Sequence, residues 1–188
     1  MAFGGTNTTG DYARGASAVA VTTGGFYNFT ASPISASSLG IQPGGSDWAP
    51  GTVTLRIQNT TGGTLTSFDV AYKLYVRNDQ ARSNSFNFSY SSDNTTYTPV
   101  GALDYTSTAA LDALGFVLNN RSTTITGLSI ANNAYFYIRW SGADVGGSGS
   151  RDEFALDDIS VTGYAAGTTS VQLTSASSGV SEGVGTTS

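Results

Sequence analysis

The feature that most constrains the fold is the run Leu65–Arg77, in which large apolar side chains alternate with polar ones. A β-strand repeats every two residues, whereas an amphipathic helix repeats every 3.6. One face of this run carries Phe68, Val70, Tyr72, Leu74 and Val76, and the other carries Asp69, Lys73 and Tyr75. The chain must therefore bury one face of at least one long strand.

Shorter runs repeat this alternation between clusters of Gly, Pro, Asn and Ser, which favour turns. We expect further strands at 18–21, 26–30, 53–57, 85–91, 95–100, 122–130, 135–140 and 153–162. The stretch 22–25 reads as a glycine turn joining the first two strands into a hairpin, and 31–50 reads as irregular. The piece 108–118 has leucines at roughly helical spacing, and we expect a turn or a single helical loop there.

Many short strands without alternating helices predict an all-β protein, an antiparallel β-sandwich of jelly-roll type. We divide the chain into a sandwich domain, 1–163, and a linker with a strand-like tail, 164–188. The tail has one strand-like centre, at Val171 and Leu173. A lone strand with unpaired amides will seek a sheet edge, so we expect a C-terminal extension strand that assembles onto a sheet. No signal peptide precedes Ala2, so we expect a segment of a longer protein.

Charge and residue usage exclude several classes of function. The chain has no His and no Cys, which rules out His-based triads, thiol catalysis and zinc sites built from these residues. The net charge of −5 with a single Lys argues against nucleic-acid binding and against anionic membrane surfaces. No apolar run approaches the ~20 residues of a membrane span.

Acidic residues gather in the last strand and the loop before it, at Asp152, Glu153, Asp157 and Asp158. Carboxylates and loop carbonyls are ligands that Ca²⁺ accepts, so a structural calcium site is one interpretation. Asp157 and Asp158 point to opposite faces of a regular strand, so both cannot reach one ion. The alternative is an Asp that caps the amides of the 142–150 loop or pairs with Arg151. Glycoside hydrolysis would need two carboxyl groups facing each other across a cleft, and nothing in the sequence indicates such a cleft.

Three aromatic residues are candidates for ligand contact: Trp48, Tyr135 and Tyr137. Tyr135 and Tyr137 lie opposite the apolar face of a strand, where amphipathic rings suit sugar stacking. Trp48 lies in a loop rich in Pro, Gly and Ser. Its indole is either a plug over the end of the sandwich or a ligand contact, and we favour the plug.

Several segments resemble a jelly-roll module found in large bacterial surface and secreted proteins, similar in plan to MAM and carbohydrate-binding jelly rolls. These segments are TVTLRIQN at 52–59, TGGTLTSFD at 61–69, SNSFNFSY at 83–90, RSTTITGL at 121–128 and the closing DEFALDDISV. The tail, VQLTSASSGVSEGVGT, resembles the first strand of a Calx-beta domain. The resemblance implies an extracellular, non-catalytic module and a structural Ca²⁺ near Asp157 or Asp158.

Three hypotheses follow. The first is a non-catalytic structural or adhesive module of a surface protein or fibre, which associates with itself or with neighbouring domains by strand addition. The second is a carbohydrate-binding module of a secreted multidomain protein, which requires solvent-facing Trp48, Tyr135 or Tyr137. The third, an enzyme using the acidic cluster, ranks last.

Overall fold

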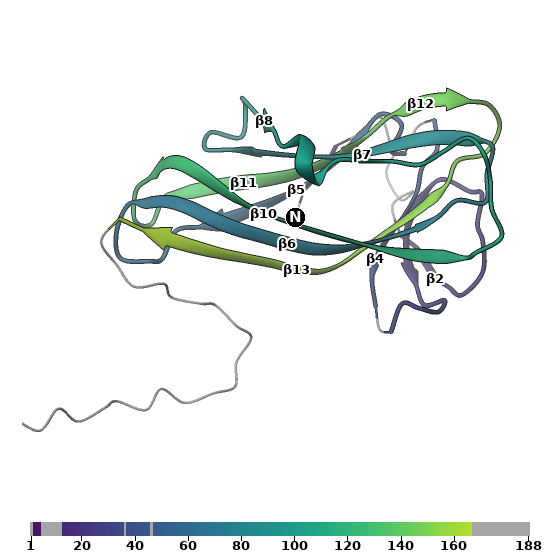
Figure 1. Ribbon diagram of the computed structural model, residues 1–188, viewed down its shortest axis with the longest axis horizontal. Helices are drawn as coiled ribbons and strands as arrows, with labels where there is room; N and C mark the ends of the chain where they lie inside the picture. The colour runs from purple at the N-terminus through teal and green to yellow at the C-terminus, as the bar shows by residue number, and fades with distance from the viewer. Residues whose placement is uncertain (1, 5–12, 36, 46, 167–188) are drawn as a thin grey trace, which may run out of the picture.

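The chain folds into two facing β-sheets, shown in the computed structural model (Figure 1), which describes residues 2–4, 13–35, 37–45 and 47–166. The first sheet has the order β1 (Ala2–Gly4), β5 (Gly51–Gln58), β11 (Tyr135–Gly142), β7 (Arg82–Ser91) and β12 (Asp144–Gly147); β8 (Thr98–Pro99) and β9 (Tyr105–Thr106) also pair with β7. The second has the order β10 (Phe116–Ile130), β6 (Leu65–Arg77), β13 (Glu153–Ala165), β4 (Leu39–Gln42), β3 (Gly25–Phe29) and β2 (Ala13–Ser17). This is the predicted sandwich of jelly-roll type.

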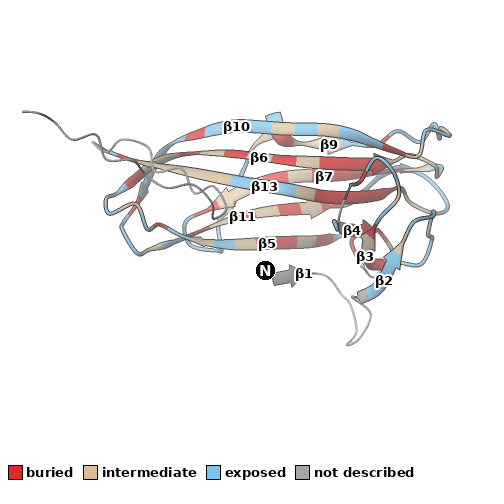
Figure 2. Cartoon of the chain, turned by 90° about the horizontal axis from the view of Figure 1, so that it is seen from below, coloured by how far each residue is buried: buried red, intermediate tan, exposed pale blue. Residues whose placement is uncertain are grey.

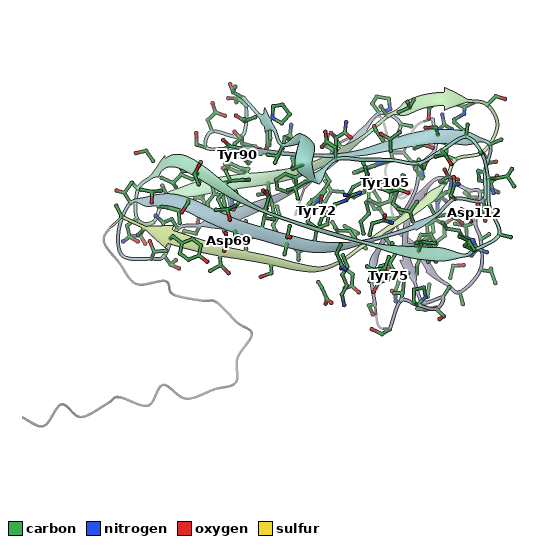
Figure 3. The ribbon with its side chains drawn as sticks, viewed as in Figure 1. Asp69, Tyr72, Tyr75, Tyr90, Tyr105 and Asp112 are labelled. Carbon is green, nitrogen blue, oxygen red and sulfur yellow. The ribbon has the colours of Figure 1, made fainter. Side chains whose placement is uncertain are left out.

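The core lies between the sheets and is built from the alternating runs that the sequence displays. Tyr72 of β6 is buried between the layers (Figure 3), and its ring meets the Trp140 ring of β11 edge-on at 5.5 Å between centroids. Its hydroxyl donates to the Leu103 carbonyl oxygen, in the short 3-10 helix Gly101–Leu103. A buried phenol hydroxyl usually needs a hydrogen-bond partner. The Leu103 carbonyl supplies one, so Tyr72 can be buried between the sheets.

A second apolar cluster covers the outer face of β6. Tyr75 points away from the main core and packs with Phe29, Ile34 and Phe116. Figure 2 shows β2, β3 and β4 gathered at one end of the molecule, and Figure 3 places Tyr75 on their side of the sheet. The prediction that Tyr75 faces away from Tyr72 is confirmed, but its ring is only 3% exposed because these strands cover it.

Predictions for the first fifty residues are partly wrong. The strand at 26–30 is confirmed as β3, but 18–21 forms no strand, and β2 comes before it. β2 pairs with β3 in parallel, so the predicted hairpin is wrong. The irregular stretch 31–50 contains β4, which pairs with β13 through Leu39, Gly40 and Ile41. A strand this short, close to prolines, carries too little alternation to detect.

The later strands agree better with the sequence. β6 has the predicted bounds, and β5, β7, β11 and β13 contain or overlap the predicted runs. The leucine-containing piece 108–118 is not helical: it is a loop of bends until β10 begins at Phe116. Gly127 has a φ of +76°, and the β10–β6 register shifts between Thr126 and Ile130. Glycine adopts this left-handed conformation without a Cβ penalty, so it accommodates the bulge.

Trp48 is a core residue. It is 0% exposed and stacks on Phe86 at 5.5 Å between ring centroids. A Cβ on Gly142 would collide with the indole Nε1, so this position needs glycine. This burial agrees with the plug interpretation, which the sequence favours, and contradicts the ligand-contact interpretation of Trp48.

Among the described residues, no helix has the length and apolar character needed to cross a membrane. The predicted assembly residues, Val171 and Leu173, lie outside the described residues, and β13 continues to Ala165, past the predicted domain boundary at 163.

Candidate functional site

The candidate site is the outer face of the first sheet, around the middle of β11. Every second residue of this part of β11 is a core residue: Phe136, Ile138 and Trp140. The residues between them, Tyr135, Tyr137 and Arg139, therefore share the face turned away from the core. The register with β5 and β7 extends this face sideways. Tyr137 lies opposite Arg56 and Ser91, and Arg139 lies opposite Thr54 and Ser89. We call this surface, defined by Arg56, Tyr97, Tyr135, Tyr137 and Arg139, the tyrosine face.

Two arginines are packed against tyrosine rings on this surface. The Arg56 guanidinium lies 4.5 Å from the centroid of Tyr135, and that of Arg139 lies 3.5 Å from the centroid of Tyr97. Arg139 Nε also donates to Thr54 Oγ1 at 2.9 Å. Cation–π contacts fix long side chains that would otherwise rotate freely, so the tyrosine face presents partly ordered guanidinium donors.

The tyrosine rings retain surface for a ligand. Tyr135 is 41% exposed, and Tyr137 is half-buried. Within the described residues, no other ring or cation stacks on Tyr137. An open ring flanked by hydroxyl and guanidinium donors can stack on the apolar face of a sugar and hydrogen-bond its hydroxyls. Of the three aromatic candidates, the structure brings Tyr135 and Tyr137 together on the surface and places Trp48 in the core.

The acidic candidates Asp152 and Glu153 lie at the start of β13, and both are fully buried. Asp152 Oδ1 accepts a hydrogen bond from the Gln80 backbone N–H at 3.0 Å, and Glu153 Oε1 accepts one from that of Val21 at 2.7 Å. Burial raises the pKa of Glu153 to about 8, and the nearby Asp79 carboxylate pushes it the same way. Burial also raises the pKa of Asp152. These carboxyl groups fix the loop 78–81 and the segment before β3.

The same region contains oxygens that could serve a hard cation. Gln42 Oε1 and Asp152 Oδ2 are buried and have no hydrogen-bond partner among the described residues. Gln42 reaches this end of the sandwich because its Nε2 donates to the Arg151 carbonyl oxygen at 2.8 Å. Unpaired amide and carboxylate oxygens suit Ca²⁺, although no group of three acidic side chains in the described part of the chain could hold a metal ion. Calcium at Asp152 and Glu153 stays a prediction.

Asp157 and Asp158 belong to a different part of β13. Strands rise about 3.3 Å per residue, so Glu153 and Asp157 are separated by about 13 Å along the strand. The β13–β6 register shifts between Asp157 and Ser160, and Asp158 has a φ of +48°. Asp158 forms an ion pair of 2.6 Å with Lys73. The four acidic candidates therefore do not converge on one point.

Arg151 pairs with an acid that was not among the candidates. Its Nε and Nη2 both donate to Asp144, at 2.6 Å each, and Arg82 donates to Asp144 Oδ2 at 2.7 Å. The hydrogen bonds from Arg151 lower the pKa of Asp144 below its usual range. This three-membered network ties β12 to β7 and the loop before β13, so a structural role accounts for these charges.

A separate cleft of about 370 Å³ lies between the β7–β8 turn and the end of β10, lined among others by Tyr90, Asp93, Thr96 and Leu128. Its carboxylate is already occupied: Asp93 Oδ1 accepts from the backbone N–H groups of Thr95 and Thr96, which lower its pKa. The cleft has the volume of a small-ligand site, but its acid serves to shape the turn.

Sequence reasoning missed the arginines of the site. Arg56 alternates with apolar residues in its run and therefore reads as a solvated residue. Only the strand register places it opposite Tyr137. Tyr97 was equally hidden, because it belongs to a turn that folds back beside β7.

No protein-family model matches this chain, and no curated protein matches it. Several solved structures resemble it. "Structure of TmCBM61 in complex with beta-1,4-galactotriose" matches at 11% identity and a TM-score of 0.39, covering 67% of this chain and 70% of that one. "CBM4 structure and function" matches at 17% and 0.39, covering 68% and 84%. A non-crystalline cellulose specific carbohydrate-binding module, CBM28, matches at 12% and 0.42, covering 66% and 73%. At these identities and TM-scores, the matches assign no role to any residue here.

Proposed function

We propose that this chain is a non-catalytic carbohydrate-binding module that works outside the cell and binds a glycan across the tyrosine face. The observation that carries the proposal is the pair Tyr135 and Tyr137, two rings on one strand that remain accessible while the aromatic residues of the opposite face are buried. Gln58 and Arg56 of β5 lie opposite Tyr135 and Tyr137, and Ser89 of β7 lies opposite Arg139. Rings supply stacking area, and the polar neighbours supply hydrogen bonds that orient a sugar.

Glycan-array screening followed by calorimetry tests this proposal. Tyr137→Ala should weaken binding by tenfold or more, because an aromatic anchor at the centre of a binding surface supplies much of its energy. Tyr137→Phe keeps the ring and should bind nearly as well as the wild type. A chain that binds no glycan, or a Tyr137→Ala variant that binds unchanged, would contradict the proposal.

A structural or adhesive module that assembles by strand addition is the second candidate, and one feature of the sandwich favours it. β13 pairs with β4 only through Phe154, Ala155 and Leu156. Among the described residues, no strand pairs with residues 157–165 on the side of β13 that faces away from β6. β5 likewise pairs with β1 only at 52–54. Unpaired edges are templates for another strand.

The two open edges flank a cavity of about 140 Å³ with a mixed lining, whose large apolar members are Ile57, Leu65, Phe136 and Val161. A strand from a second copy, with Val171 and Leu173 pointing inward, would have the right alternation for this seam. Light scattering tests this candidate. Val171→Asp combined with Leu173→Asp should abolish association, whereas Val180→Asp with Val184→Asp adds the same charge outside the strand-like centre and should not. A monomeric wild type would exclude it.

A further inference from the structure

We infer that the glycan bound at the tyrosine face is acidic, carrying carboxylate or sulfate groups. The inference rests on the proposed function and adds the chemical class of its ligand. It comes from the positive charges on this surface, which are opposite in sign to the net charge of the whole chain, −5.

Among the described residues, no carboxylate pairs with either arginine of the tyrosine face. Four other cations pair with carboxylates: Arg77 with Asp79, Arg82 and Arg151 with Asp144, and Lys73 with Asp158. Arg121 instead lies over the Tyr105 ring. In the part of the chain that the structure describes, Arg56 lies over the Tyr135 ring, Arg139 lies over the Tyr97 ring and donates to Thr54, and neither forms an ion pair. Their guanidinium groups therefore retain N–H donors that are not hydrogen-bonded to a carboxylate of the described residues.

Strand register places the two arginines close together. Arg139 lies opposite Thr54, and Arg56 is two residues further along the same strand. The Cα atoms of such diagonal neighbours are separated by about 7–8 Å. The surrounding positions of the register are neutral: Thr52, Gln58, Asn87, Ser89, Ser91, Pro99 and Ser141. A chain of net charge −5 thus presents a local positive patch.

This arrangement suits an anionic sugar better than a neutral one. Guanidinium groups match the geometry of carboxylate and sulfate oxygens and form charge-assisted hydrogen bonds with them. Asp93, in the turn after β7, accepts hydrogen bonds from Ser91 and from two backbone N–H groups of the same turn.

The test compares matched charged and neutral glycans by calorimetry. Oligogalacturonate and oligoalginate are the acidic probes, and their fully methyl-esterified forms are neutral probes with the same sugar backbones. We expect the acidic forms to bind at least tenfold more tightly, with affinity that falls as salt is raised. Arg56→Gln and Arg139→Gln should each weaken acidic binding about tenfold, whereas Lys73→Gln, which removes a charge from the other sheet, should not.

The outcomes separate the two proposals. If the neutral forms bind as tightly and Tyr137→Ala abolishes binding, sugar binding stands and the acidic class is wrong. If the acidic forms bind but both arginine variants and salt leave the affinity unchanged, the assignment to these arginines is wrong. If no glycan of the array or of this panel binds, the proposed function itself fails.

Discussion

The guanidinium of Arg56 lies 4.5 Å from the centre of the Tyr135 ring, on the outer face of a strand pair whose inner face is core. This contact joins β5 and β11 on the exposed surface, where Tyr135 is 41% exposed. This arginine, which pairs with no carboxylate of the described residues, is the central feature of the proposed binding face.

Tyr135 should contribute to binding and little to folding. We expect Tyr135→Ala to weaken glycan binding several-fold and to change the free energy of unfolding by less than about 1 kcal/mol, because the ring is partly exposed. Calorimetry and urea unfolding measure the two effects separately. Large destabilisation with unchanged binding would show that the ring is a structural residue.

A side chain at Gly142 should destabilise the fold, because its Cβ would collide with Trp48 Nε1. We expect Gly142→Ala to cost about 1–3 kcal/mol in the free energy of unfolding, as overpacked cores do. Gly101→Ala is the matched control, since a Cβ there meets nothing within 4 Å. Chemical denaturation of both variants decides the point; equal stability would mean that Trp48 can move aside.

Stability should fall as the pH rises from about 5 to 8. The pKa of Glu153 is raised to about 8 in the folded chain, whereas an unfolded glutamate titrates near ~4.3. Between these values the folded state holds a proton that the unfolded state has released. The free energy of unfolding therefore decreases with pH, by at most about 1.4 kcal/mol per unit, and levels off above the folded-state pKa.

Glu153→Gln is the variant that checks this assignment. Its amide oxygen can still accept from the Val21 N–H but does not titrate, so most of the slope should disappear. The raised pKa of Asp152 leaves a smaller decrease of the same sign. An unchanged slope in urea titrations at several pH values would assign the effect to another group.

Calcium binding at the buried end of β13 predicts a metal-dependent thermal midpoint. A ligand that binds only the folded state stabilises it by about 2.7 kcal/mol at a hundred times its Kd. Asp152→Asn should remove the response to Ca²⁺, whereas Asp157→Asn should keep it, since that residue lies about 13 Å along the strand from Glu153. Identical midpoints with calcium and with chelator would remove calcium from the account.

The sequence predicts the long strands because their alternation reflects one buried and one open face, as in β6 and β11. It does not predict β4 or the parallel β2–β3 pair. The position of such a short strand depends on pairing with residues distant in sequence, as Leu39 pairs with Leu156. The sequence favours a plug for Trp48, but only the folded chain shows that its indole packs against Gly142. At the site, the alternation in β11 predicts that Tyr135 and Tyr137 face outward. The arginines join them through strand register and turn geometry, which cannot be read from one sequence.

The most direct test of the account is an NMR titration of the isotopically labelled chain with the glycan that binds most tightly. We expect the shifted amides to cluster in β11 at Tyr135–Arg139 and in β5 around Arg56, with the Arg139 and Arg56 side-chain signals moving together. Shifts confined to the cleft lined by Tyr90, Thr96 and Leu128 would place the ligand elsewhere and contradict the assignment of the tyrosine face.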